Sequence, residues 1–427
     1  MTTPADSTTR HYARALDAAD PLARFRERFF LPRHPADGTP VVYLTGNSLG
    51  LQPRSTAAFV QAELAHWAEH GVEGHFREPG RWVDYHQRLT APLARVMGAQ
   101  PGEVVAMNTL TVNLHLLLIS FYRPTKTRYK LLLEGGAFPS DQYAAESQVR
   151  LHGLDPATAI VELNPRPGEH TLRAEDIEAA IQTHGESLAT ILIGGINYYT
   201  GQLFDMAAIT RWGHAVGATV GFDLAHAAGN VPLHLHEWGP DFACWCSYKY
   251  LNSGPGGVSG VFVHARHANR PGLPRLAGWW GHDAGVRFKM EPGFRPMPGA
   301  EGWQLSNAQV IPLAMHRAAL EVVEDAGGME VLREKAVRLT AYLEALLNDL
   351  ALPPDILENI TPPDPAQRGS QLSLLVNRNG RALFEALTAA GIVADWREPN
   401  VIRIAPVPLY NSFEDAWRFV EVLRQAV

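Results

Sequence analysis

The stretch FACWCSYKYLNSGPGG, residues 242–257, begins as a buried strand and ends in a glycine cluster, and Lys249 lies between two tyrosines where the strand stops. The first five residues are apolar on both faces of a strand, which is typical of a sheet covered by helices on both sides. The lysine has two explanations. Its stem packs while its ammonium reaches water, or its amine belongs to a site at the carboxyl end of the strand.

Similar short apolar runs occur at regular intervals around this strand. They are YKLLLE (129–134), TAIVEL (158–163), ATILIGG (189–195), ATVGFD (218–223) and VSGVFVH (258–264). Segments with helical spacing, such as residues 173–185 and 205–217, separate most of them. Short runs joined by crossover helices predict a doubly covered sheet. The predicted fold class is therefore α/β, with a mostly parallel mixed sheet in a large domain.

The rest of the chain predicts a smaller α/β unit after the large domain. Residues 311–350 read as long helices that break at Gly327 and Gly328, and residues 370–427 alternate strand-like and helix-like segments. The Pro-rich stretch LPPDILENITPPDP (352–365) is interpreted as a surface loop. The expected organisation is an N-terminal segment, 1–74, that packs with the small domain, a large domain, 75–310, and a small C-terminal domain, 311–427.

Length and charge point to an enzyme that acts on a small molecule. The chain has 427 residues, which exceeds the size at which one hydrophobic core stops growing, so more than one domain is expected. The formal net charge of -7 gives no electrostatic reason to expect nucleic acid or an anionic membrane as a partner. Residues 1–30 mix charges throughout, so neither a signal peptide nor a membrane span is expected.

Cysteine usage favours a cytoplasmic location. The only two cysteines are Cys244 and Cys246, and their spacing in a strand points them to opposite faces. Neither a disulfide framework nor a metal site is therefore expected.

Polar groups follow several predicted strands at their carboxyl ends, where ligands bind in α/β sheets. Asp223 closes one run, Lys249 follows the next, and Phe138 lies just after the run that ends at residue 134. Pyridoxal phosphate (PLP) requires all three groups: an amine that forms an imine with its aldehyde, a carboxylate at its ring nitrogen and an apolar face for its ring. Each residue also has a separate structural explanation, since Asp223 suits the start of a helix and Phe138 suits a core. One cofactor explains the set.

Longer blocks then form an ordered series over nearly the whole chain. They are GNSLGLQP (46–53), MNTLTVNLHLLL (107–118), FPSDQYAAESQ (138–148), NYYTGQLFD (197–205), GFDLAHAAGNVPL (221–233), DFACWCSYKYLNSGPGG (241–257), GWWGHD (278–283) and IRIAPVPLYNSFED (402–415). In these blocks the sequence resembles kynureninase. The resemblance implies the aspartate-aminotransferase fold (type I) of PLP enzymes and a homodimer whose active sites lie at the subunit interface.

The resemblance also implies a role for individual residues. It predicts that Lys249 holds PLP, that Asp223 pairs with the ring nitrogen, and that Tyr248 reaches the phosphate. The remaining cofactor-binding residues that it implies are Leu110, Thr111, Phe138, Ser140, Asp141, His226, Trp279 and Asn307, of which Trp279 and Asn307 match positions supplied by the partner subunit. The implied substrate-binding residues are Asn47, Ser48, His75, Asn307 and Arg403, with Arg403 as the clamp for the α-carboxylate. Gly194 departs from relatives that carry a serine there.

The activity implied by the resemblance is hydrolysis of L-kynurenine, or of 3-hydroxykynurenine, to an anthranilate and L-alanine. Lys249 is the expected general base and acid. Tyr248 is a candidate proton donor, although the same hydroxyl also suits phosphate binding alone. The corresponding metabolic role is tryptophan degradation or the supply of NAD precursors, and the sequence leaves open both that choice and the choice of substrate.

Two other functions fit the same fold. Cysteine desulfurases and selenocysteine lyases share a similar lysine strand, but they need a thiol on a loop well after the lysine, and here both cysteines precede Lys249. A PLP-binding protein without turnover is the second alternative. Loss of the lysine, the aspartate or the carboxylate-binding arginine would favour it, and Lys249, Asp223 and Arg403 are all present.

Overall fold

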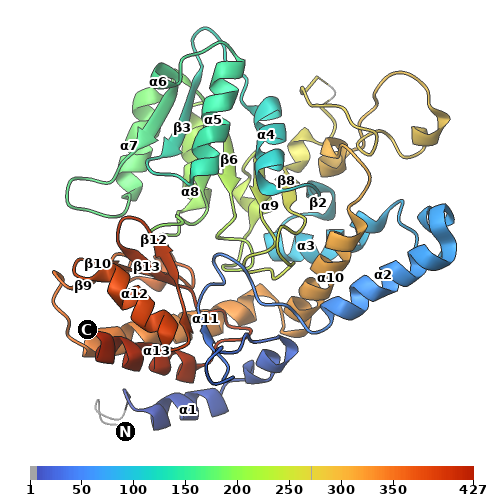
Figure 1. The fold of residues 1–427 in the computed structure, drawn as a ribbon. Helices are drawn as coiled ribbons and strands as arrows, with labels where there is room; N and C mark the ends of the chain where they lie inside the picture. Colours follow the sequence, from blue (N-terminus) through green and yellow to red (C-terminus); the bar gives the residue numbers. More distant parts are fainter. Residues whose placement is uncertain (1–6, 271) are drawn as a thin grey trace.

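A seven-stranded sheet forms the centre of the computed structural model, which describes residues 7–270 and 272–427. The strand order is β2-β8-β7-β6-β5-β3-β4, and Figure 1 labels β2, β8, β6 and β3 of this sheet. The strands are β2 Val104–Ala106, β3 Lys130–Glu134, β4 Ile160–Leu163, β5 Leu188–Gly194, β6 Thr219–Asp223, β7 Phe242–Trp245 and β8 Gly260–Val263. The five strands from β4 to β7 pair in parallel, whereas β8 runs antiparallel to both β7 and β2. The predicted mostly parallel mixed sheet is therefore confirmed.

The strands are apolar on both faces because each face supports a separate core. On β3, Leu131 and Leu133 belong to one buried cluster and Leu132 belongs to the other. This alternation follows from the period of two in a strand. Helices α4 (Leu110–Phe121) and α5 (Pro139–Leu151) contribute to the first cluster, and α7 (Ala174–His184) and α8 (Met206–Ala215) contribute to the second. The shorter helices of this region are α3 Thr90–Met97, α6 Pro156–Ala159 and α9 Leu235–Trp238.

A smaller antiparallel sheet, in the order β12-β13-β10-β9, lies in the C-terminal part of the chain (Figure 1). Its strands are β9 Leu357–Asn359, β10 Leu372–Val376, β12 Asp395–Arg397 and β13 Val401–Ile404. The helices of this part are α11 Met329–Asp349, α12 Gly380–Ala389 and α13 Phe413–Ala426, and they share a third buried cluster with the sheet. The interpretation of residues 352–365 as a loop is wrong at β9, because residues 357–359 pair with β10 despite the flanking prolines.

The N-terminal region contacts both halves of the molecule. Helix α1 (Arg10–Ala18) packs against α13, and strand β1 (Val42–Tyr43) pairs with β11 (Ile392–Val393). A buried ion pair of 2.7 Å joins Asp20 to Lys335 of α11. Helix α2 (Thr56–His70) instead packs beside α10 (Val310–Asp325). The domain boundaries given by the sequence stay predictions, and residues 1–6 of the first segment lie outside the described residues.

Short 3-10 helices connect many of these elements. They are η2 Ala23–Arg28, η3 Gly71–His75, η4 Tyr85–Leu89, η5 Pro101–Glu103, η6 Ala265–His267, η7 Arg287–Lys289, η8 Gly299–Trp303 and η9 Pro365–Gln367. Over the two described ranges, no helix combines the length and the apolar composition that crossing a membrane requires.

Candidate active site

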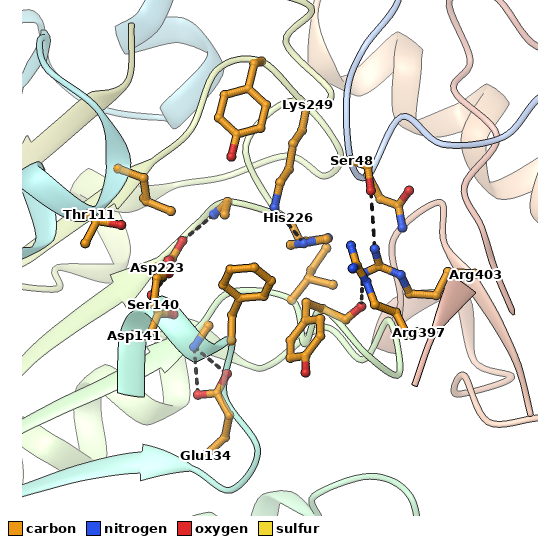
Figure 2. Close-up of a pocket in the computed structure, with 18 of the residues that line it drawn as sticks. Ser48, Thr111, Glu134, Ser140, Asp141, Asp223, His226, Lys249, Arg397 and Arg403 are labelled. Carbon is orange, nitrogen blue, oxygen red and sulfur yellow. Dashed lines mark hydrogen bonds between the residues drawn. The ribbon is translucent and has the colours of Figure 1, made fainter. Parts of the chain in front are cut away.

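A cavity of about 420 Å³ lies at the carboxyl edge of the central sheet, where the large sheet faces the small one (Figure 2). Its volume is within the range of small-molecule sites. Most of the predicted site residues line it: Asn47, Ser48, Leu110, Thr111, Phe138, Ser140, Asp141, Asp223, His226, Tyr248, Lys249 and Arg403. They come from segments far apart in the sequence, and the strand order brings those segments together.

Lys249 reaches this cavity from the loop after β7. Its Nζ lies 2.9 Å from Nε2 of His226 and 5.9 Å from the ring centroid of Phe138. The N-terminal loop comes close enough to support the lysine because residue 50 is glycine. The Gly50 N–H donates to the Tyr248 carbonyl at 2.8 Å, and a Cβ at Gly50 would lie only 2.3 Å from the Lys249 carbonyl oxygen.

His226 lines the cavity as a neutral ring, and its Nδ1 is buried. Burial, with the positive charges of Lys249 and Arg403, holds its pKa well below the ordinary value. A neutral ring that accepts from the Lys249 ammonium at Nε2 carries its proton on Nδ1. Within the described residues this buried Nδ1 has no hydrogen-bond partner. A buried donor without a partner favours a polar ligand at this position.

Asp223 and Asp141 form a buried carboxylate pair. Asp223 ends β6 and accepts the Ala225 N–H at 2.7 Å, but residues 225–230 form turns, so the helix start suggested for it is absent. Burial raises the pKa of Asp223, and burial together with the charge of Asp223 raises the pKa of Asp141 well above its ordinary value. The two acids hydrogen-bond to each other. The pair therefore retains a proton more readily than two exposed carboxylates would.

Glu134 is a third buried carboxylate, and the sequence analysis did not include it in the site. Both of its oxygens accept the Gly194 N–H, at 3.0 and 3.1 Å, and burial raises the pKa of Glu134 to about 7. Its position as the last residue of the run YKLLLE was the available signal. Gly194 matters here because a Cβ at that residue would lie 2.8 Å from Oε1 of Glu134.

The first turn of α4 provides an anion site at one end of the cavity. Thr109 is the N-cap, and its side chain makes no capping hydrogen bond. The uncapped N–H groups and the positive end of the helix dipole therefore suit a phosphate, as expected for Leu110 and Thr111. The backbone enters the helix through Asn108 at a φ of 49°, where the Asn108 amide donates to the Asn113 side chain at 3.0 Å. Asparagine tolerates this conformation better than most residues.

Tyr248 lies in the same cavity and remains protonated. Burial raises the pKa of its phenol above the ordinary value of about 10, and Cys246 adds to the increase. The charge of the Asp223 carboxylate raises this pKa further. Tyr248 is therefore a hydrogen-bond donor at neutral pH.

Arg403 lies at the other end of the cavity, on β13, and is 1% exposed. Its Nη1 donates to the Tyr198 carbonyl at 2.7 Å, and its Nη2 lies 2.9 Å from Oδ2 of Asp395. Burial lowers the pKa of Arg403. The sequence analysis missed Asp395 and also missed Tyr198 and Arg397, which line the cavity. Tyr198 lies in the block NYYTGQLFD, which was a signal, but Asp395 and Arg397 lie in none of the quoted blocks.

Three predicted site residues lie outside the cavity of the single chain: His75, Trp279 and Asn307. Trp279 is 42% exposed, and its Nε1 donates to the Arg287 carbonyl at 3.2 Å. His75 lies in η3, where its Nδ1 is 3.1 Å from the Val72 carbonyl oxygen. Asn307 is exposed. Within one chain, the structure does not bring these side chains to Lys249.

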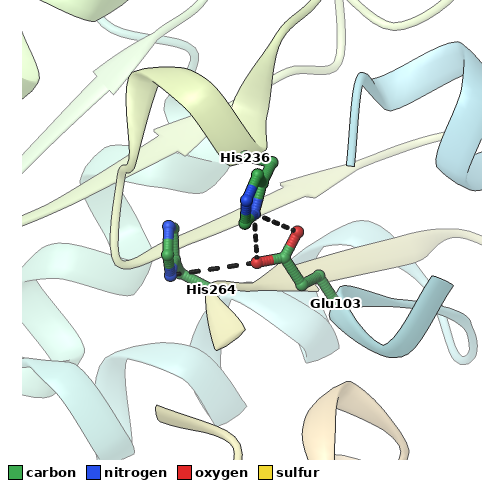
Figure 3. Close-up of side chains that lie close together, drawn as sticks. All are labelled: Glu103, His236 and His264. Carbon is green, nitrogen blue, oxygen red and sulfur yellow. Dashed lines mark hydrogen bonds and ion pairs between the residues drawn. The ribbon is translucent and has the colours of Figure 1, made fainter. Parts of the chain in front are cut away.

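A separate cluster at the opposite edge of the sheet consists of Glu103, His236 and His264, here called the Glu103 cluster (Figure 3). Their potential ligand atoms lie within 4.8 Å of one another. Glu103 already accepts the Ala265 N–H at 2.7 Å and bonds with Nδ1 of His236 at 3.0 Å. Nδ1 of His264 accepts the Arg266 N–H at 3.1 Å, so its lone pair is in use. The cluster is therefore a hydrogen-bonded support for three segments.

The residues at the cavity fit PLP. The uncapped helix start suits its phosphate, the carboxylate pair suits its ring nitrogen, Phe138 suits its ring, and Lys249 suits its aldehyde. No cysteine lines the cavity in the described residues. Both thiols are buried, whereas the desulfurase alternative requires a thiol on a loop after the lysine.

Solved structures share the fold. The cysteine desulfurase CsdA from Escherichia coli is 18% identical, with a TM-score of 0.74 over 95% of this chain and 98% of that chain. The cystine C–S lyase C-DES is also 18% identical, with a TM-score of 0.75 over 90% of this chain and 97% of that chain. Another C-DES structure carries glycine covalently linked to its PLP cofactor. Fold and site together define a PLP-dependent enzyme of fold type I.

Sequence comparisons identify the family. The chain is 56% identical to a kynureninase of Myxococcus xanthus over 99% of both chains, and 57% identical to a kynureninase of Xanthomonas campestris pv. campestris over 97% of both. The kynureninase C-terminal domain model matches residues 332–423. The chain belongs to the kynureninase family, and the resemblance found in the sequence is confirmed.

Proposed function

We propose that this chain uses PLP to hydrolyse L-kynurenine to anthranilate and L-alanine. The observation that carries the proposal is the arrangement of one cavity, with an uncapped helix start at one end, Lys249 in the middle and a buried arginine at the other end. An amino acid attached to PLP would have its groups in the same sequence, with the phosphate at the helix start, the reacting carbon at Lys249 and the α-carboxylate at the arginine.

Bound PLP would supply an electron sink that makes the Cα proton of the substrate acidic and accepts electrons when the Cβ–Cγ bond breaks. Lys249 is the residue placed to hold the cofactor and then to move a proton at Cα. His226 supports this role because it accepts a hydrogen bond from the amine at 2.9 Å and has no charge to repel it. Asp223 and Asp141 would hold a proton at the ring nitrogen.

Two other side chains have proposed roles on the substrate. Arg403 binds the α-carboxylate, since a planar guanidinium matches a carboxylate with two parallel hydrogen bonds. Tyr248, protonated at neutral pH, donates either to the phosphate or to the hydrated γ-carbonyl. Asn47 and Ser48 approach from the N-terminal loop, and Thr111 and Ser140 complete the cofactor side.

The test is anthranilate release from L-kynurenine, followed by fluorescence. Lys249→Ala should reduce the rate by at least about 10³-fold, because it removes both the cofactor attachment and the proton carrier. Lys126→Ala, at an exposed loop residue, is the matched control and should retain full activity. A wild-type protein whose cofactor absorbance responds to kynurenine without anthranilate release would instead be a binding protein, and the proposal would fail.

We infer that the site also accepts 3-hydroxykynurenine. The supporting contact is the hydrogen bond from Nδ1 of His75 to the Val72 carbonyl, which leaves Nε2 as an acceptor for a ring hydroxyl or amine. The inference requires that His75 reach the substrate, together with Asn307. A value of kcat/KM for 3-hydroxykynurenine about a hundredfold below that for kynurenine would contradict it, since one lost contact accounts for less.

We also infer a homodimer in which a second copy supplies His75, Trp279 and Asn307. The support is a group of exposed apolar side chains in contact with His75 and Trp279, namely Phe76 and Phe288. The ring centroid of Phe288 lies 5.6 Å from that of Phe76 and 5.5 Å from that of Trp279. Contiguous exposed rings of this kind are typical of protein interfaces.

Mixed dimers test this arrangement. Lys249→Ala and Asn307→Asp should each be inactive alone, but an equal mixture after subunit exchange should recover about a quarter of the wild-type activity, because half the dimers then contain one intact site of two. A monomer in gel filtration, or no recovery after verified exchange, would refute the shared site.

The cellular role follows from the substrate. We infer a place in tryptophan degradation or in the supply of NAD precursors, in the cytoplasm. Two free, buried thiols are consistent with a reducing compartment. Cell fractionation with an activity assay would test the compartment.

A further inference from the structure

Arg403 and Asp395 lie directly opposite each other on neighbouring strands. In the antiparallel pair of β12 and β13, the register places Asp395 opposite Arg403. Residues opposite each other in such a pair have side chains close enough to interact. The small sheet therefore fixes the Asp395 carboxylate beside Arg403, the residue that we propose binds the carboxylate of the substrate.

The hydrogen bonds of the Arg403 guanidinium are divided between two edges. Asp395 occupies the Nε edge, with Nε donating to Oδ1 at 3.3 Å and Nη2 lying 2.9 Å from Oδ2. The Tyr198 carbonyl accepts one N–H of Nη1 at 2.7 Å. Nη2 also donates to the Ser48 hydroxyl at 3.4 Å, so of the five N–H groups one on Nη1 has no partner among the described residues, and the outer edge offers another carboxylate this N–H beside the long Nη2 bond. Arg403 lines the cavity.

Ser48 and Arg397 hold Asp395 in place. The Ser48 hydroxyl donates to Oδ2 of Asp395, and Nη2 of Arg403 lies 3.4 Å from that hydroxyl oxygen. Nε of Arg397 lies 3.1 Å from Oδ1 of Asp395. Asp395 is therefore enclosed by donors from three segments, and its side chain is 11% exposed. Two guanidinium groups around one carboxylate leave a net positive charge that a bound carboxylate would neutralise.

We propose that Asp395 is the positioning residue that makes this site select amino acids over amines. It turns the Nε edge of Arg403 away from the cavity and leaves the outer edge to bind the α-carboxylate. The inference rests on the proposed function, since it assigns Arg403 to the substrate. It goes beyond that function by naming the group that sets the orientation of the clamp.

A simpler role for Asp395 predicts the opposite result. If Asp395 only neutralised charge, removing its charge would leave two cations near the substrate and would strengthen carboxylate binding. If it orients Arg403, an amide in its place offers one acceptor oxygen instead of two and no charge, so the outer edge of the buried guanidinium is no longer held toward the cavity. Hydrogen bonds to charged groups are strong enough that the loss of orientation should outweigh the electrostatic gain from removing the charge of Asp395.

The experiment compares two ligands in the PLP-loaded enzyme: L-kynurenine and the amine that lacks its α-carboxylate. Affinity is measured from the change in cofactor absorbance, and kcat and KM are measured for kynurenine. Asp395→Asn removes the charge, and Asp395→Glu keeps the charge but changes its position. Asp355→Asn, at the exposed ion pair with Arg378, is the matched control.

Both Asp395 variants should lower the preference for the carboxylate ligand by about 10- to 100-fold, with KM raised and kcat changed less than about threefold. Amine binding should stay as in wild type. A preserved preference in either folded variant, or a lower KM in Asp395→Asn, would overturn the proposal. If one variant does not fold, the other decides. A wild-type enzyme that binds both ligands but releases no anthranilate would instead refute the proposed function.

Discussion

The two edges of the central sheet contain the same kinds of buried residues in opposite electrostatic conditions. At the edge opposite the cavity, Asp241 precedes β7 and accepts hydrogen bonds from His214 at 2.9 Å, from His267 at 2.8 Å and from the Val220 N–H at 2.8 Å. Burial alone would raise the pKa of Asp241, but these hydrogen bonds outweigh it and lower the pKa below its ordinary value. The Glu103 cluster at this edge is paired in the same way (Figure 3).

At the carboxyl edge, the buried acids have fewer donors. Asp223 accepts one backbone N–H and shares a hydrogen bond with Asp141, and Glu134 accepts one N–H with both oxygens. Both pKa values are raised by burial. Buried polar groups without enough partners cost stability, so a fold retains them where a ligand completes them. At these two edges of the central sheet, the number of donors around a buried acid, rather than its burial, therefore separates the support from the site.

The sharpest test of this contrast makes the same substitution at both edges. Asp223→Asn should lower kcat/KM for kynurenine by about 10² to 10³-fold, because an amide cannot hold the ring nitrogen protonated through its charge. Asp241→Asn should leave kcat/KM per folded enzyme unchanged, since Asp241 lies at the other edge. Anthranilate fluorescence, normalised to bound cofactor, measures both. Equal losses of activity in the two variants would remove the distinction between the edges.

The free energy of unfolding should fall more in Asp241→Asn than in Asp223→Asn, which is the reverse of the order expected for activity. Asp241→Asn should lower the free energy of unfolding by about 4 kcal/mol at pH 7, because the buried His267, the more exposed His214 and the Val220 N–H lose their charged partner. A lowered folded pKa means that this contribution is present above about pH 4, the unfolded value, and is lost as pH falls further. The difference from wild type should therefore shrink below pH 4. Urea unfolding at pH 7 and pH 3.5 measures it, and a constant difference would contradict the pairing.

Sequence reasoning located the site because the strand ends carry most of it. The apolar runs before Asp223 and Lys249 gave both the strand positions and the chemistry that follows them. It missed the three-residue strands β2, β9 and β12 and the two-residue strands β1 and β11, since such strands are too short for a clear period. It missed Asp395 because its role depends on the register of β12 against β13, which no local pattern specifies.

The contribution of Glu134 to stability should change with pH in the direction opposite to that of Asp241. Its folded pKa of about 7 lies above the unfolded value, so the acid form favours the fold and stability falls as pH rises from about 4.5 to about 7. The total loss is on the order of 3 kcal/mol. Glu134→Gln should remove this slope in protein stripped of cofactor, whereas Glu186→Gln, at an exposed residue, should keep it. Thermal unfolding between pH 4.5 and pH 8 measures the slope, and parallel curves for Glu134→Gln and wild type would show that the carboxyl titrates normally.

The smallest effect is expected at Gly194, beside Glu134. A Cβ there would lie 2.8 Å from Oε1 of Glu134, so the carboxylate must move and weaken its bond with the Gly194 N–H. Gly194→Ala should therefore cost about 1 kcal/mol of stability. Gly194→Ser should recover part of this cost, because its hydroxyl can donate to the displaced carboxylate. The recovery should disappear when Glu134 is already glutamine, which a double-mutant cycle on thermal unfolding measures. If serine restores stability equally in the Glu134→Gln background, the hydroxyl contacts a different group. The residue at position 194 then does not act through the Glu134 carboxyl.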